Sequence, residues 1–125
     1  MKTVIVGGHV VKGSGIGKQH GLPPTMNIEV QGMSEPLEQG IYVVQISETN
    51  SPLYNGVAHF GPRPAVNAPD SFEVHCFDFD QDWYGKKVAV QVLHKLREIE
   101  NFASIPDLAA AIDNDITEAK KWFAR

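Results

Sequence analysis

Two short segments carry side chains whose types and spacing could bind a phosphate or accept a hydroxyl proton. In the first, Thr25 and Asn27 follow a pair of prolines and stand two residues apart in an expected strand. Side chains at positions i and i+2 of a strand share one face, so this hydroxyl and carboxamide would lie about 7 Å apart. Hard oxygens of this kind suit a Mg²⁺ ion that also binds phosphate oxygens. The alternative is a turn followed by an edge strand with two solvated polar groups.

The second segment begins at Phe72 and alternates polar and apolar residues. Glu73 and His75 share one face, and the other face is apolar (Phe72, Val74 and Cys76). A carboxylate within hydrogen-bond reach of a substrate hydroxyl can accept its proton as the oxygen attacks, which makes Glu73 a candidate general base. The alternative is that Glu73 and His75 form the ordinary solvent-facing side of a half-buried strand.

Residues 13–18 form a glycine-rich loop that is a further candidate for phosphate binding. Glycines without a Cβ let backbone N–H groups approach an anion closely, and this loop has three (Gly13, Gly15 and Gly17). The phosphate-loop pattern is not met, because Lys12 stands where its first glycine is needed and Gln19 follows Lys18 in place of Ser or Thr. The dinucleotide-binding pattern also fails, because its third glycine comes one residue early. A flexible turn is the alternative interpretation.

The elements that must position these side chains are predicted to be strands. Eleven glycines and eight prolines, most of them in the first seventy residues, leave runs too short for helices there. Seven β-branched or aromatic runs are expected to be strands (residues 3–6, 9–11, 27–30, 41–46, 53–60, 72–79 and 87–96). From Ser104 onward apolar residues recur at helical spacing, which predicts a helix over residues 105–124. We therefore expect an all-β barrel or sandwich with one helix on its outside or across one end.

Composition limits the classes of protein that the chain can belong to. It has 125 residues and a net charge of −4, which argues against a broad basic surface for nucleic acid. A single cysteine, Cys76, excludes an internal disulfide framework and a cysteine-based zinc site, and it fits a reducing compartment. The apolar run near the N-terminus has three residues, too few for a signal sequence or a membrane span. We therefore expect a cytosolic location and no membrane contact.

Two metal-site patterns are incomplete. Asp78, Asp80 and Asp82 have the alternate spacing that begins a calcium loop, but Trp83 occupies the position where that loop needs glycine. The five histidines show no paired zinc-ligand spacing. We interpret the acidic segment as a turn between two strands.

Taken in order, the segments resemble the riboflavin kinase (flavokinase) family, in particular the C-terminal kinase domain of bifunctional riboflavin kinase/FAD synthetases. The resemblance extends from about residue 10 to residue 123. It is carried by six segments in the family's order: residues 13–18, Pro24-Thr25-Met26-Asn27, Gly40-Ile41-Tyr42, residues 56–64, residues 73–85, and Leu96-Arg97-Glu98 with Phe102 and Asp115.

The resemblance implies a single riboflavin kinase-like domain over residues 1–125. Its fold would be a six-stranded antiparallel Greek-key β-barrel, about residues 1–100, with a C-terminal α-helix packed against it. The implied reaction transfers the γ-phosphate of ATP to the 5′-hydroxyl of riboflavin and forms FMN, with Mg²⁺ as the metal. The implied partners are these small molecules, with no nucleic acid, and the chain is expected to be a monomer.

The resemblance also implies roles for individual residues. Glu73 would be the catalytic base, and Thr25 and Asn27 would hold the metal and the phosphates. The nucleotide would further contact the glycine-rich loop (Gly13, Gly15, Gly17 and Lys18). The flavin would contact the segment after the last strand (Arg97, Glu98 and Phe102).

The chain departs from the family pattern at several positions. Gly21-Leu22-Pro23 replaces the usual Leu-Gly-Phe, Ile16 and Lys18 stand where arginines are common, and Met26 replaces an alanine. Because these changes alter the phosphate side, a second hypothesis is a non-catalytic barrel that binds a flavin or a nucleotide as a sensor or interaction module. A third is an unrelated barrel that binds a protein through Trp83 and Tyr84. An adenylyltransferase domain precedes the kinase in many bacterial members and is not part of this sequence, which leaves a stand-alone kinase and a piece of a longer chain as two expectations.

Overall fold

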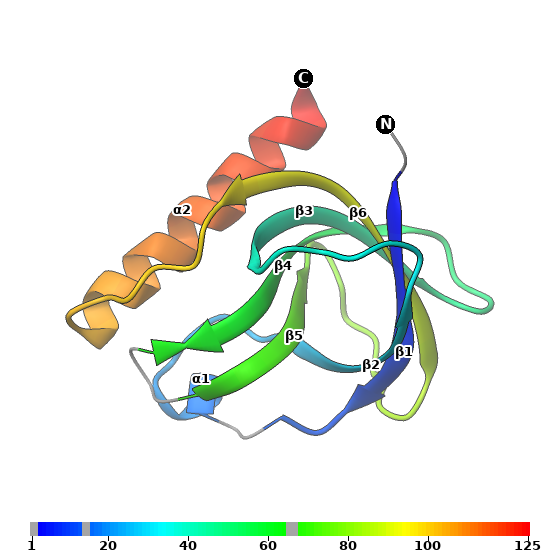
Figure 1. Cartoon of the computed structure of the whole chain (residues 1–125), viewed down its shortest axis with the longest axis horizontal. Helices are drawn as coiled ribbons and strands as arrows, with labels where there is room; N and C mark the ends of the chain where they lie inside the picture. The colour runs from blue at the N-terminus through cyan, green and yellow to red at the C-terminus, as the bar shows by residue number, and fades with distance from the viewer. Residues whose placement is uncertain (1–2, 14–15, 65–67) are drawn as a thin grey trace.

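The structure, a computed structural model, describes residues 3–13, 16–64 and 68–125. Within these residues six strands close into a barrel in the order β1-β2-β5-β4-β3-β6, and neighbouring strands are antiparallel (Figure 1). The strands are β1 (Val4–Val11), β2 (Met26–Met33), β3 (Gly40–Glu48), β4 (Tyr54–Arg63), β5 (Ala68–Cys76) and β6 (Lys87–Arg97). The expected six-stranded antiparallel barrel is therefore confirmed.

Strand β1 corrects one detail of the sequence prediction, which divided this region at Gly7 and Gly8. The backbone continues through both glycines, and a β-bulge lies between them. A Cβ on Gly8 would lie 2.2 Å from the carbonyl oxygen of Glu29, so the close approach of β1 to β2 needs glycine at this position. The two predicted runs are thus one strand.

Alternate residues of each strand fill the barrel interior. Val88, Val90 and Val92 of β6 belong to the buried core, as their period-two spacing predicts. Phe72 and Val74 of β5 belong to the same core, with exposed fractions of 3% and 1%. The residues that alternate with these core residues along β5 and β6 therefore lie on the outer face of the barrel.

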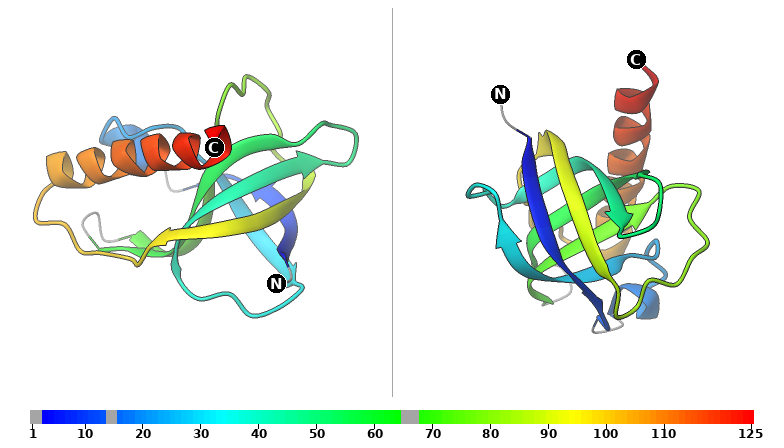
Figure 2. Two further views of the ribbon diagram at one scale, coloured as in Figure 1. Left: turned by 90° about the horizontal axis from the view of Figure 1, so that it is seen from above. Right: turned by 90° about the vertical axis from the view of Figure 1, so that its right-hand side faces the viewer.

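The C-terminal helix α2 (Ile105–Ala124) lies against the outside of the barrel, across β3, β4 and β6 (Figure 2). Its N-cap is Ser104, whose hydroxyl accepts a hydrogen bond from the backbone N–H of Asp107 at 3.2 Å, and Pro106 lies in the first turn. Ala119 is fully buried against a second apolar cluster on the outer side of β3 and β4. The predicted cap and helix are both present.

A short helix, α1 (Ile16–Gln19), was not expected in the glycine-rich loop. It ends where the backbone N–H of Gly21 bonds to the carbonyl of Lys18 at 3.1 Å, and Gly21 has a positive φ of 70°. Glycine adopts this left-handed conformation without steric cost, so Gly21 can end the helix. The glycines that predicted a flexible turn here are thus compatible with a short helix that a glycine terminates.

Among the described residues, no helix is both long and apolar enough to cross a membrane.

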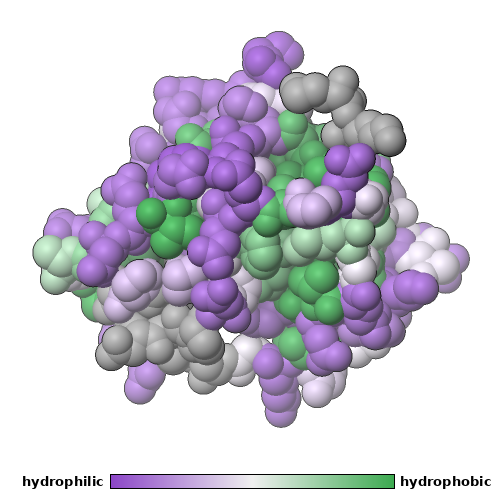
Figure 3. All heavy atoms as spheres, in the orientation of Figure 1, coloured by the Kyte–Doolittle hydropathy of each residue, from purple (hydrophilic) through white to green (hydrophobic). Residues whose placement is uncertain are grey.

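In the orientation of Figure 1, hydrophilic side chains cover much of the α2 side of the molecule, whereas apolar side chains gather near the middle of the visible barrel face (Figure 3).

Candidate active site

A single row of cross-strand partners runs over the outer face of the barrel and connects the predicted site residues. Asn27 on β2 is opposite Glu73 on β5, and Glu73 is opposite His59 on β4. His59 is in turn opposite Ile41 on β3, which is opposite Arg97 on β6. Adjacent strands lie about 4.8 Å apart, so this row brings together residues that are up to 70 positions apart in the chain.

Glu73 is the centre of a hydrogen-bonded group at one end of this row. The hydroxyl of Thr25, which immediately precedes β2, donates to Glu73 Oε1 at 2.9 Å. The hydroxyl of Ser71 donates to Glu73 Oε2 at 2.7 Å. The Glu73 side chain is only 16% exposed, so the alternative of an ordinary solvent-facing position on the strand is wrong.

His59 lies on the other side of the Glu73 carboxylate and was not singled out in the sequence. Its side chain is 8% exposed, and Nδ1 lies 4.0 Å from Glu73 Oε2. Nε2 bonds to the carbonyl oxygen of Pro62 at 3.0 Å, so this nitrogen carries a hydrogen. Sequence reasoning could place His59 on a strand but could not supply the register that sets it opposite Glu73.

The predicted nucleotide-binding residues are only partly brought to this end of the row. A Cβ on Gly13 would lie 2.1 Å from Asn27 Nδ2, so the glycine backbone lies directly against the Asn27 carboxamide. Gly17 and Lys18 belong to α1, where Lys18 is exposed. Gly15 lies outside the described residues.

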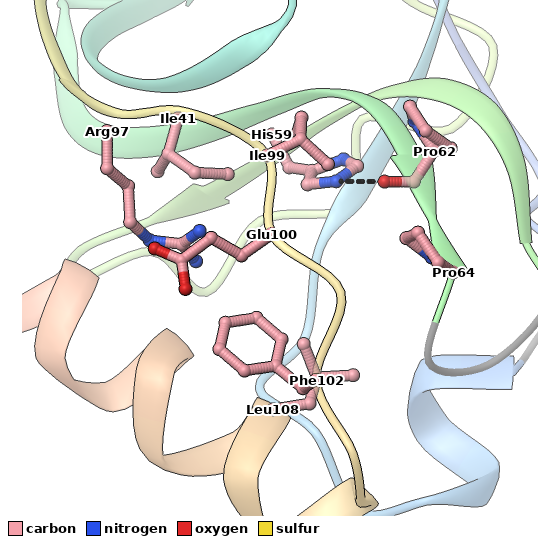
Figure 4. A pocket seen from close by; sticks show the side chains of 9 residues that line it. All are labelled: Ile41, His59, Pro62, Pro64, Arg97, Ile99, Glu100, Phe102 and Leu108. Atoms are coloured by element: carbon pink, nitrogen blue, oxygen red, sulfur yellow. Dashed lines mark hydrogen bonds between the residues drawn. The ribbon is translucent and has the colours of Figure 1, made fainter.

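A pocket lies at the other end of the row, between the barrel, the loop after β6 and the start of α2 (Figure 4). It is shallow and open to solvent. Its lining includes Ile41, His59 and Arg97 from the row, with Phe102 from the loop and Leu108 from α2. His59 therefore borders both the pocket and Glu73.

The three predicted flavin-binding residues do not all line this pocket. Arg97 and Phe102 do, and the Arg97 guanidinium carbon lies 5.5 Å from the centre of the Phe102 ring. Glu98 is exposed and forms an ion pair with Lys95 at 2.6 Å. The hydrogen bond with Glu98 is the main cause that raises the pKa of Lys95.

Arg97 is fixed by Asp115 on α2. Its Nε and Nη2 donate to Asp115 Oδ1 and Oδ2, both at 2.8 Å, and Nη1 donates to the carbonyl of Glu98 at 3.0 Å. Planar guanidinium groups match carboxylates in this two-bond geometry. The pocket wall is thereby tied to both the helix and the loop.

Thiol chemistry is disfavoured at the site. Burial raises the pKa of the Cys76 thiol, on the same strand as Glu73, to about 12. A thiol with so high a pKa is protonated near neutral pH and is a poor nucleophile or metal ligand.

The described residues contain no group of three or more His, Cys, Asp or Glu side chains that could hold a metal ion. A metal at this site would therefore depend on other oxygens. Because the Thr25 hydroxyl donates its hydrogen to Glu73, the lone pairs of its oxygen stay available to a cation. Together with the Asn27 amide oxygen, this donor set fits a Mg²⁺ ion that takes its remaining ligands from phosphate and water.

The aromatic pair Trp83-Tyr84 divides between core and surface. Trp83 is 5% exposed and makes edge contacts with Tyr54 and Phe79, whereas Tyr84 is 59% exposed. Trp83 is thus a core residue and not the surface anchor that the third hypothesis considered.

The barrel carries a partly buried carboxylate, Glu73, and a pocket, and His59 borders both, which is the arrangement of a small enzyme. Residues 1–123 match the Flavokinase family, described as riboflavin kinase, and the chain belongs to this family. The hypothesis of a non-catalytic barrel is not favoured by this match.

Two curated relatives support the assignment, and one solved structure shares the fold. The chain is 38% identical over 117 residues to a bifunctional riboflavin kinase/FMN adenylyltransferase of Haemophilus influenzae, covering 93% of this chain and 37% of that protein. It is 35% identical over 121 residues to the RNA-binding riboflavin kinase RibR of Bacillus subtilis, covering 95% and 51%. The crystal structure of riboflavin kinase from Trypanosoma brucei shares the fold, with a TM-score of 0.62, 20% identity and coverage of 100% and 82%. The chain thus spans about a third to a half of these curated relatives' length.

Proposed function

We propose that this chain is a riboflavin kinase that transfers the γ-phosphate of ATP to the 5′-hydroxyl of riboflavin and releases FMN and ADP. The observation that carries the proposal is the row from Asn27 to Arg97. It joins a group with the polar chemistry of a phosphate site to a pocket with an apolar and aromatic lining, and Glu73 and His59 lie between them. Family membership supports the same reaction.

In this proposal Glu73 accepts the proton of the 5′-hydroxyl as its oxygen bonds to the γ-phosphorus and the bond to the β–γ bridging oxygen breaks. Phosphoryl transfer requires mainly in-line placement and charge neutralisation, so a small barrel with one carboxylate can supply it. The position of Glu73 next to His59 supports the role, because His59 borders the pocket where the alcohol would lie.

Thr25 and Asn27 are the proposed ligands of Mg²⁺ and its phosphates. When bound, this ion would neutralise negative charge on the nucleotide phosphates. The lack of a side chain at Gly13 keeps the backbone close to Asn27, so backbone groups of the loop and the carboxamide could contact the same phosphate. Gly15, Gly17 and Lys18 complete the proposed nucleotide contacts.

The flavin ring is proposed to occupy the pocket bordered by Arg97 and Phe102, whose guanidinium group and aromatic ring form part of its wall. Glu98 would contact the flavin only if its ion pair with Lys95 opens. Riboflavin and ATP are thus the proposed partners. A monomeric state, a cytosolic location and the lack of nucleic-acid binding stay predictions from the sequence.

The test is incubation of the purified chain with riboflavin and Mg-ATP, followed by chromatographic separation of flavins. We expect FMN to appear in proportion to ADP and to require both substrates. Riboflavin binding without any FMN would contradict the kinase proposal and support a binding module. No binding of either substrate would contradict both.

A further inference from the structure

Ser71 contacts the proposed base but has no role in the reaction as described so far. Its hydroxyl donates to Glu73 Oε2 at 2.7 Å, which is shorter than the bond of 2.9 Å from the Thr25 hydroxyl to Oε1. Ser71 and Glu73 are two residues apart on β5, so their side chains share the outer face of the strand. Ser71 is partly buried, which protects the bond from competing water.

The two carboxylate oxygens of Glu73 have different surroundings. Oε1 accepts from Thr25, on the side of the proposed metal and phosphates, whereas Oε2 accepts from Ser71 and lies 4.0 Å from His59 Nδ1. A terminal carboxylate torsion is broad and weakly restrained by itself. The hydrogen bond from Ser71 therefore limits rotation of the carboxylate about this torsion.

We propose that Ser71 is a positioning residue for Glu73. It holds Oε2 in place, so that the carboxylate plane keeps a fixed orientation toward the alcohol throughout turnover. The inference rests on the proposed kinase function and adds to it a residue outside the segments that carry the family resemblance. It predicts that Ser71 affects the chemical step and not the binding of either substrate.

The test compares Ser71→Ala and Ser71→Thr with a matched control, Ser34→Ala. Ser34 also makes one hydrogen bond through its hydroxyl, at 2.8 Å to the backbone N–H of Ile5, but it lies on the loop after β2, away from the residues of the row. Because small misplacements of a reacting group are costly, we expect kcat of Ser71→Ala to fall by about 10- to 100-fold. The KM values for riboflavin and Mg-ATP should change less than twofold, and Ser71→Thr should restore most of kcat.

A double-mutant cycle with Glu73→Gln separates positioning from a structural effect. If Ser71 acts through Glu73, then adding Ser71→Ala to Glu73→Gln should lower kcat no further. Urea unfolding of each variant establishes that the proteins compared are folded at the assay temperature.

The outcomes distinguish this inference from the proposed function. An active wild-type protein with a Ser71→Ala variant of unchanged kcat would overturn the positioning role and leave the kinase proposal standing. The same conclusion follows if Ser34→Ala loses as much activity as Ser71→Ala, or if the two effects add in the double variant. No FMN from the wild-type protein would overturn both.

Discussion

The guanidinium of Arg97 and the carboxylate of Asp115 form a two-bond ion pair that joins the end of β6 to α2. Both bonds are 2.8 Å long, and the Asp115 side chain is only 7% exposed. Because Arg97 also donates to the carbonyl of Glu98, one side chain fixes the strand end, the following loop and the helix around the pocket.

We expect Asp115→Asn to destabilise the protein by about 1.5–3 kcal/mol, the usual contribution of hydrogen bonds to charged groups. It should also raise the KM for riboflavin more than that for Mg-ATP, because Arg97 borders the pocket and not the Glu73 group. Urea unfolding and steady-state kinetics measure the two effects. Asp113→Asn, at an exposed position of the same helix, is the control. Equal changes in both KM values would contradict the assigned place of the flavin.

Glu73→Gln keeps the size of the side chain and removes its ability to accept a proton as a carboxylate. General bases contribute about 10²- to 10⁴-fold, so we expect kcat to fall by that factor while riboflavin binding persists. Single-turnover assays and fluorescence titration of riboflavin measure this, with Glu29→Gln on the exposed side of β2 as the control. A variant with the wild-type rate would remove Glu73 from the mechanism.

Gly13→Ala tests the contact between the glycine-rich loop and Asn27. The added Cβ would lie 2.1 Å from Asn27 Nδ2, so the carboxamide or the loop must shift. We expect Mg-ATP to bind at least tenfold more weakly, that is, with a loss of about 1.4 kcal/mol, and riboflavin to bind as before. Gly32→Ala on β2 is the control, because a Cβ there meets nothing within 4 Å. Calorimetric titrations that show equal losses for both ligands would argue against a nucleotide site at this loop.

The raised pKa of Cys76 predicts that stability falls at alkaline pH. Burial raises the pKa from 9.0 to about 12, so between these values the unfolded chain loses a proton that the folded chain keeps. Stability therefore declines as pH rises from about 9 to 12. Burial also raises the pKa of Tyr42, which makes stability fall with rising pH in the same way. The contribution of the thiol is therefore measured by comparing the wild-type protein with Cys76→Ala. Urea unfolding at pH 8 and pH 10.5 should show a smaller decline in Cys76→Ala, and an identical decline would exclude the thiol as a cause.

The individual elements were predictable because their determinants are local, whereas the choice of a six-stranded barrel over a sandwich came from the family resemblance. The alternation around Val90 and Phe72 places those residues inside the barrel, and the cap at Ser104 begins the helix, as their spacing indicates. The short helix α1 was missed because glycine is a poor helix former in general. Here a single helical turn forms, and Gly21 ends it by adopting a positive φ.

The candidate site was only partly predictable. Thr25, Asn27 and Glu73 could be named from their residue types and from the family resemblance, and the structure brings them together. Ser71 was missed because the predicted strand began at residue 72, whereas β5 begins at Ala68. His59 could not be named, because its place beside Glu73 depends on the register between β4 and β5. Such long-range register is set by the closed barrel as a whole and is not encoded in any short segment.

Closure of the barrel by β1 and β6 has a consequence for the way the chain reaches its native state. Val4 pairs with Val92, so β1 cannot obtain this neighbour until the chain as far as β6 has emerged from the ribosome. Pairings between such distant positions carry a large loop-closure entropy and slow the folding of β proteins. Until then β1 has an unpaired edge, and exposed strand edges of this kind are where nascent chains associate with one another.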